Sequence, residues 1–276
     1  LADDAEFLLD SETRADHLLR VMETLPGSPD SARAATRFRE MLGNGLLARP
    51  GRFAERIAKI RDRLPPGTSV EPVPEARREI DLLLADAFDR AGSDAACDAV
   101  LDAGGFLRGG FVAGPFGRTV PGAIDVPFSA EPLPDPNRTF DDNGRAKAFQ
   151  YFRSGVGDPA VPVPAWSGGG VAYFLAGFVS GTDRIFLDVE SAGPVRIWID
   201  GRPVFRGDPV ANAEPTWNRV GVSLRDFRAS PILNGMWLGG RFCLLVKSRV
   251  DMPRPVVRIV DANGVPFRFA KDAAGG

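Results

Sequence analysis

The sequence is poor in the residues that most often carry catalysis or bind metals. It contains one histidine, His17, and two cysteines, Cys97 and Cys243. The cysteines are too few for a zinc site and stand in different halves of the chain, so we expect two buried thiols rather than a disulfide. We expect His17 to face a helical core, and no GxSxG, HExxH or Walker A motif occurs. We therefore predict that the chain is not an enzyme.

An excess of positive charge and a long apolar run are also missing. The formal net charge is −2, which argues against a nucleic-acid partner. Nearly all basic residues are arginine, which we interpret as the codon bias of a GC-rich bacterial genome. No apolar run reaches the roughly 18 residues that span a membrane. No signal peptide is visible, and because the chain begins at Leu1 rather than Met, we expect a processed form or a fragment of a longer protein.

The first part of the chain has helical periodicity, with apolar residues spaced three and four apart. Proline and glycine clusters at 26–29, 43–45 and 65–67 separate the periodic stretches. Helices are expected over 3–25, 31–42, 53–64, 74–88 and 93–101. Asp30 or Ser31 is the expected cap of the second helix, and Ser93 that of the last. Residues 1–104 are thus predicted to form a small all-α helical domain.

After Gly105 the pattern changes to the alternation of β-strands. Strands are expected over 171–179, 184–190, 195–200, 202–205, 217–224, 241–247, 256–260 and 265–269. Asp200 and Gly201 predict a two-residue hairpin turn. Residues 117–165 are too rich in proline for central strands, so we expect irregular or extended structure there. The predicted fold class is a two-domain α+β protein, with an antiparallel β-sandwich over residues 105–276.

Several motifs in this second part resemble a known module. They are IFLDVESAGPVRIWIDGRPVF at 185–205, RVGVSL at 219–224, RFCLLVKS at 241–248 and FVAGPF at 111–116. Over about residues 106–270 the chain resembles the galactose-binding-domain-like jelly roll of bacterial multidomain proteins. The segment between Leu224 and Arg241 departs from that pattern. The resemblance implies a lectin-like or scaffolding role outside the cytoplasm, in the periplasm, at the cell surface or in the secreted fraction.

Tryptophan residues at loops or strand ends are the best indication of a ligand. An exposed indole ring there could stack on a sugar, although packing in the core is the competing interpretation. The candidate ligand-binding residues are Trp166, Trp217 and Trp237, flanked by Arg196 or Arg219. Trp198 alternates with its neighbours, so it is expected to face away from Val195, Ile197 and Ile199.

The densest acidic cluster is Asp141-Asp142-Asn143-Gly144. We interpret it as a solvated turn, with a structural calcium ion held by Asp141, Asp142 and Asn143 as the alternative, because calcium prefers several oxygen ligands. The EF-hand spacing is not met, and no other cofactor is expected.

Two interaction-type domains without a catalytic set favour a non-catalytic structural protein. We expect it to act in scaffolding or protein–protein assembly, through a protein partner or self-assembly, at or outside the bacterial cell envelope. The alternative is a carbohydrate-binding module, in which a glycan is the partner, as an accessory part of a larger glycan-active enzyme. A third hypothesis is a fragment of an enzyme whose catalytic domain lies outside this chain.

Overall fold

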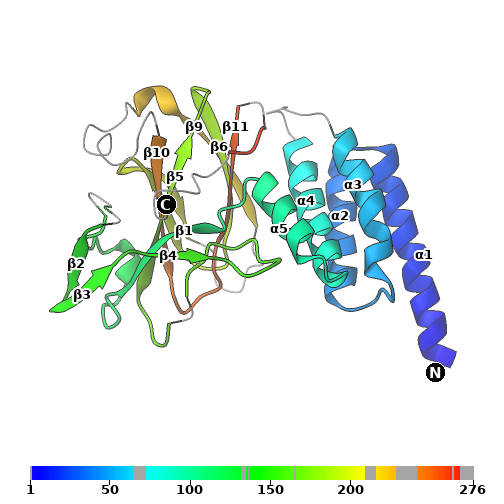
Figure 1. Ribbon diagram of the computed structural model, residues 1–276, viewed down its shortest axis with the longest axis horizontal. Helices are drawn as coiled ribbons and strands as arrows, with labels where there is room; N and C mark the ends of the chain where they lie inside the picture. The colour runs from blue at the N-terminus through cyan, green and yellow to red at the C-terminus, as the bar shows by residue number, and fades with distance from the viewer. Residues whose placement is uncertain are drawn as a thin grey trace. The chain divides into compact units, whose positions relative to one another are not determined.

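The structure is a computed structural model that describes residues 2–64, 73–131, 135, 137–164, 166–208, 216–227, 241–262 and 264–267. The chain divides into two compact units between Gly104 and Gly105, the first being Leu1–Gly104 with Asn263–Val265. The described helices of the first unit and the antiparallel strands of the second confirm the predicted α+β layout with two domains (Figure 1). Within the described residues, no helix is both long and apolar enough to cross a membrane.

Five α-helices form the first unit at the places that the proline and glycine breaks predict. They are α1 (Ala2–Thr24), α2 (Pro29–Gly43), α3 (Ala54–Arg63), α4 (Val73–Arg90) and α5 (Asp94–Ala103), with a short 3-10 helix η1 (Pro50–Phe53) before α3. Helix α2 packs against α1 and α4, and α4 also contacts α3 and α5. Residues Ile80, Leu83 and Leu84 of α4 are fully or almost fully buried, as their spacing predicts.

One expectation about the helix caps is wrong, and another holds only in part. Ser28, rather than Asp30 or Ser31, caps α2: its hydroxyl accepts a hydrogen bond from the Ser31 amide at 3.1 Å. The helix starts early because Pro29 fits its first turn, where no amide hydrogen is needed. Ser93 is the N-cap residue of α5 as predicted, but its side chain makes no capping hydrogen bond.

His17 is exposed rather than directed at the helical core. The buried side of α1 runs through Ala15, Leu18, Leu19 and Met22. His17 lies off this stripe because adjacent residues of a helix point about 100° apart. The two cysteines are buried and free, which confirms the prediction made for them.

The strands of the second unit form three antiparallel sheets. The six-stranded sheet has the order β4-β1-β5-β10-β7-β8, the three-stranded sheet β11-β6-β9, and β2 pairs with β3. Their bounds are β1 (Gly109–Phe116), β2 (Thr139–Asp142), β3 (Arg145–Ala148), β4 (Gln150–Arg153), β5 (Val171–Val179), β6 (Arg184–Glu190), β7 (Val195–Ile199), β8 (Arg202–Gly207), β9 (Trp217–Ser223), β10 (Arg241–Arg249) and β11 (Val256–Asp261). The short 3-10 helices η2 (Ala123–Asp125) and η3 (Leu224–Asp226) lie between strands.

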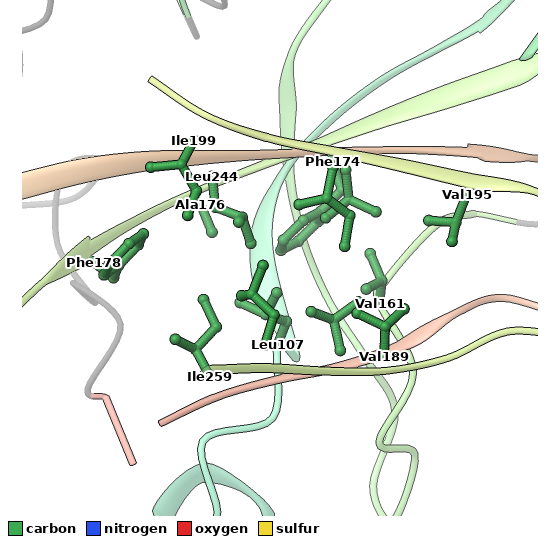
Figure 2. Packing of buried hydrophobic residues seen from close by; sticks show 14 of the residues in the cluster. Leu107, Val161, Phe174, Ala176, Phe178, Val189, Val195, Ile199, Leu244 and Ile259 are labelled. Atoms are coloured by element: carbon green, nitrogen blue, oxygen red, sulfur yellow. The ribbon is translucent and has the colours of Figure 1, made fainter. Parts of the chain in front are cut away.

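The two larger sheets pack face to face around an apolar core (Figure 2). Phe174 of β5, Ile197 of β7 and Leu244 of β10 come from the six-stranded sheet, and Leu187 of β6 and Ile259 of β11 from the three-stranded sheet. All five are fully buried. The apolar layer between the two sheets is the core of a β-sandwich. We call the side of the six-stranded sheet that faces this core its inner face.

The outer face of the six-stranded sheet is covered in part by residues 117–131 and 137–149, which we call the covering segment. Ala123 and Ile124 of η2 and Phe140 of β2 pack there against Tyr173 and Leu245. The proline-rich region thus contains the β2–β3 hairpin, the edge strand β4 and η2 where we expected irregular or extended structure. Burial on both faces explains why β5 is apolar at nearly every position.

The turn predicted at Asp200 and Gly201 is confirmed. Both residues have positive φ, 46° and 76°, as a two-residue hairpin between β7 and β8 requires. Asp200 is held in this conformation because its carboxylate accepts a hydrogen bond from the Cys243 amide at 2.8 Å. The turn joins β7 to β8, and a register shift between Ile197 and Trp198 then places Trp198 opposite Pro203.

Candidate ligand-binding pocket

A pocket of about 430 Å³ lies on the outer face of the six-stranded sheet, at the end that β7 and β8 form. Alternation along the strands places Arg196 and Trp198 of β7 and Lys247 of β10 on this face, because Val195, Ile197 and Val246 point into the core. The other lining residues come from the covering segment and from β8: Ile124, Asp125, Glu131, Pro203, Val204, Phe205 and Arg206. We call it the β7–β8 pocket.

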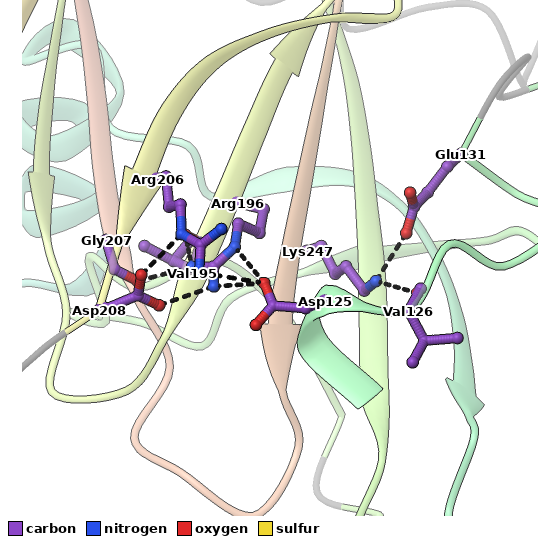
Figure 3. A network of polar contacts seen from close by, with 9 residues as sticks. All are labelled: Asp125, Val126, Glu131, Val195, Arg196, Arg206, Gly207, Asp208 and Lys247. Carbon is purple, nitrogen blue, oxygen red and sulfur yellow. Dashed lines mark hydrogen bonds and ion pairs between the residues drawn. The ribbon is translucent and has the colours of Figure 1, made fainter. Parts of the chain in front are cut away.

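Arg196 organises the charged side of this pocket (Figure 3). Its Nε and Nη2 donate to Asp125 Oδ1 at 3.0 and 2.6 Å, and Nη2 also lies 2.7 Å from Asp208 Oδ1. Its Nη1 donates to the backbone carbonyls of Val195 and Gly207. The Arg196 side chain is only 7% exposed, so these contacts take it out of water and fix its position.

Arg206 lies beside Arg196, since the two residues are paired across β7 and β8. Its Nε donates to Asp208 Oδ2 at 2.7 Å, and its Nη2 lies 3.6 Å from Asp125 Oδ1. The hydrogen bond with Asp208, together with the negative charges of Asp125 and Asp208, raises the pKa of Arg206. The same hydrogen bond, together with the hydrogen bond and positive charge of Arg196, lowers the pKa of Asp208. Both groups are therefore charged at neutral pH.

A buried charge pair supports the wall of the pocket that the covering segment forms. Lys247 is 1% exposed, and its Nζ donates to Glu131 Oε1 at 2.6 Å and to the Val126 carbonyl at 2.7 Å. Tyr173, opposite Lys247 in the β5–β10 pairing, donates its hydroxyl to the same oxygen of Glu131. Burial lowers the pKa of Lys247, with Glu131 opposing the shift, whereas burial and Glu131 together raise the pKa of Tyr173 well above its usual range.

Trp198 supplies an apolar surface among these charges. It is half-buried and packs against the outer-face cluster, and Pro203 is its partner in the β7–β8 register. An aromatic ring beside fixed hydrogen-bonding groups can hold a ligand that has one apolar face and a polar rim.

Of the predicted ligand-binding residues that the structure describes, only Arg196 lines this pocket. Trp166 is half-buried and packs against the inner-face core. Trp217 is the first residue of β9, opposite Glu190 in the three-stranded sheet. Trp237 lies outside the described residues.

Arg219 also belongs to the three-stranded sheet, in β9. Its Nη1 lies 3.3 Å from Asp188 Oδ1, and its guanidinium group lies 4.6 Å from the centre of the Phe186 ring. Its described contacts are therefore with neighbouring side chains of β6.

The predicted calcium residues form the turn of the β2–β3 hairpin. Asn143 and Gly144 have φ of 55° and 78°, and Asp141 Oδ1 accepts the Gly144 amide at 3.0 Å. Asp142 Oδ1 accepts the Gly117 amide at 3.3 Å. In the described parts of the chain, no group of three or more histidine, cysteine or acidic residues could hold a metal ion.

Most residues of the β7–β8 pocket were not among the ligand-binding residues predicted from the sequence. Asp125 and Glu131 come from the proline-rich region, where no periodicity indicates which residues approach the sheet. Lys247 and Trp198 did carry a signal: each lies among buried residues of a strand, at a position whose neighbours on both sides face the core. A lysine at such a position is costly to bury alone, so it indicates a buried carboxylate partner.

Comparisons with known proteins give little further information. No protein-family model matches the chain, and no curated protein matches it significantly. A GH31 alpha-xylosidase from Xanthomonas citri is 13% identical over 37% of this chain and 11% of that chain, with a TM-score of 0.26. The PA14 domain of the antifreeze protein MpAFP is 12% identical over 39% of this chain and 46% of that chain, with a TM-score of 0.23. The matches span less than half of either protein, and at such TM-scores they carry no argument about fold or function.

Proposed function

We propose that this chain is a non-catalytic carbohydrate-binding protein whose ligand occupies the β7–β8 pocket. The observation that carries the proposal is the position of the half-buried Trp198 beside Arg196, Arg206 and Asp125 in one concave site. The apolar face of a sugar ring can pack on the indole, while its hydroxyl groups exchange hydrogen bonds with the charged residues. The galactose-binding-like assignment and a location outside the cytoplasm, both implied by the sequence resemblance, are part of this proposal.

The charge state of the pocket supports binding rather than hydrolysis. Most glycosidases need one carboxylic acid that is kept protonated by a raised pKa. The pKa of Asp208 is instead lowered, mainly by its hydrogen bond with Arg206. Asp125 and Glu131 are each held by a hydrogen bond of 2.6 Å from a cationic side chain, Arg196 for the first and Lys247 for the second.

The geometry favours this function over the predicted role in protein assembly. Small-molecule sites are concave and combine apolar walls with a few fixed polar groups, as this pocket does. Protein interfaces instead place an apolar, charge-depleted centre inside a polar rim. The β7–β8 pocket is lined by five charged side chains and a single tryptophan, and Asp208 pairs with two of those charged side chains.

Isothermal titration calorimetry of the full chain against a panel of plant and bacterial oligosaccharides tests the proposal. We expect binding by the wild type and at least a tenfold loss of affinity in Trp198→Ala, since an aromatic contact in a binding site commonly contributes that much. Trp217→Ala, the same substitution in the three-stranded sheet, is the matched control and should bind normally. The proposal fails if no glycan binds, if Trp198→Ala binds like the wild type, or if a bound glycan is hydrolysed.

A further inference from the structure

The two arginines of the β7–β8 pocket have different roles. Arg196 uses all its donor groups on Asp125, Asp208 and two backbone carbonyls, and it is almost fully buried. It therefore positions the two carboxylates and has no donor left for a ligand. The Arg206 side chain is 65% exposed and makes its contacts through Nε and Nη2. Its Nη1 is free of hydrogen bonds to the described residues, so Arg206 can donate to a ligand.

Asp125 offers a free acceptor beside that donor. All its contacts with Arg196 and Arg206 are made by Oδ1, and no described residue donates to Oδ2. Figure 3 shows this second oxygen pointing away from both arginines. The Asp125 side chain is 51% exposed, so a ligand can reach Oδ2.

The charges of the pocket balance when Asp208, which pairs with both arginines, is counted with the lining residues. Arg196, Arg206 and Lys247 face Asp125, Asp208 and Glu131, and every one of them is in an ion pair within the site. An acidic ligand would have to displace a carboxylate from an arginine, at the cost of leaving a charge unpaired. A neutral ligand can add hydrogen bonds without breaking any pair.

We propose that the β7–β8 pocket selects a neutral sugar by two adjacent hydroxyl groups, one donating to Asp125 Oδ2 and its neighbour accepting from Arg206. This inference rests on the proposed carbohydrate-binding function and names the class of sugar. Because the donor and the acceptor of the protein lie side by side, a pair of hydroxyl groups on neighbouring ring carbons matches both at once. The sugar ring then packs on Trp198, next to Pro203.

The size of the pocket limits the length of the ligand. Its volume of about 430 Å³ is in the lower part of the roughly 300–1,000 Å³ typical of small-ligand sites. It therefore has room for one or two sugar rings and not for a long glycan chain. The recognised unit is thus one or two sugar rings of the ligand.

The test uses the full chain and compares matched sugars by isothermal titration calorimetry. The probes are the methyl glycosides of glucose, galactose and mannose, their singly deoxygenated analogues, and the corresponding uronic acids. At least one neutral glycoside should bind more tightly than its uronic acid. Removing either of two adjacent hydroxyl groups should weaken binding at least tenfold, because each forms a hydrogen bond to a charged group.

Substitutions in the protein test which side chains bind the two hydroxyl groups. Asp125→Asn and Arg206→Gln should each lower the affinity for the neutral glycoside at least fivefold and reduce the penalty for the missing hydroxyl group. Asp183→Asn and Arg225→Gln, which change an exposed ion pair on the three-stranded sheet side, are the matched controls and should leave binding unchanged. Far-UV circular dichroism and thermal unfolding verify that each variant is folded.

The outcomes separate this inference from the proposed function. Tighter binding of a uronic acid, or normal binding by Asp125→Asn and Arg206→Gln, overturns the inference while the carbohydrate-binding function stands. Absence of binding to every neutral and acidic probe and to the oligosaccharide panel overturns both.

Discussion

The two faces of the six-stranded sheet are built from the same strands but differ in what they can do. The inner face carries the apolar cluster that packs against the three-stranded sheet. The outer face is apolar only under the covering segment and ends in the charged β7–β8 pocket. One strand, β7, contributes Ile197 to the first and Trp198 to the second. The comparison shows how a sandwich can use one set of alternate residues for its core and leave the other set to line a pocket.

The largest expected effect comes from a substitution that creates a cavity in the inner face of the six-stranded sheet. Phe174 of β5 is fully buried there, so Phe174→Ala should lower the free energy of unfolding by about 3–5 kcal/mol. Urea denaturation followed by circular dichroism measures this loss. A loss under about 1 kcal/mol would show that the inner face is not the main core of the second unit.

The next effect concerns the charge pair that supports the outer face. Lys247→Met leaves the Glu131 carboxylate without its cation, and we expect a loss of about 3 kcal/mol in the free energy of unfolding. In the double variant Lys247→Met with Glu131→Gln, the loss in the free energy of unfolding should be smaller than the sum of the two single losses by at least about 1 kcal/mol. Additive losses in the double-mutant cycle would contradict a direct interaction between the two side chains.

Tyr173 should produce a smaller effect that depends on pH. Tyr173→Phe removes its hydrogen bond to Glu131 and should cost about 1–2 kcal/mol at neutral pH. The pKa of Tyr173 is raised in the folded state, so the folded protein keeps a proton that the unfolded chain releases above about pH 10. Its contribution to stability is therefore complete below that pH and is lost as the pH rises further.

Phenolate absorbance checks this prediction directly. The chain has two tyrosines, so in a Tyr151→Phe variant the signal comes from Tyr173 alone. We expect phenolate to form only together with alkaline unfolding seen by circular dichroism. Ionisation of Tyr173 while the protein is still folded would contradict its burial against Glu131.

The smallest change in stability is expected at the exposed edge of the pocket. Arg206 is 65% exposed, and exposed ion pairs contribute little, so Arg206→Gln should change the free energy of unfolding by under about 1 kcal/mol. Its effect should appear in ligand affinity instead. A loss of stability as large as that of Lys247→Met would mean that Arg206 belongs to the framework of the fold and not to a binding surface.

Local patterns were enough to predict the five helices and the strands from Val171 onward, but not β1 to β4. Proline and glycine clusters mark the ends of the helices, and alternation places Trp198 opposite to Val195, Ile197 and Ile199. The predicted orientation of His17 was wrong because the sequence of α1 is compatible with two different apolar stripes. Only packing decides which of the two stripes is buried.

The candidate site was far less predictable. Asp125 and Arg196 are 71 residues apart, and Glu131 and Lys247 are 116 apart. No local propensity connects such pairs, because they meet only after the covering segment folds over the sheet. The sequence could indicate that Arg196 and Lys247 need partners, but not which carboxylates supply them.

The central claim is that carbohydrate binds on the outer face, at Trp198. The most direct measurement is a titration of the ¹⁵N-labelled chain with the best-binding glycan, following the indole N–H signals of the tryptophans by nuclear magnetic resonance. The Trp198 signal, assigned with a Trp198→Phe variant, should shift with the glycan while those of Trp166 and Trp217 stay in place. An unchanged Trp198 signal, with or without movement of another tryptophan, would contradict the account.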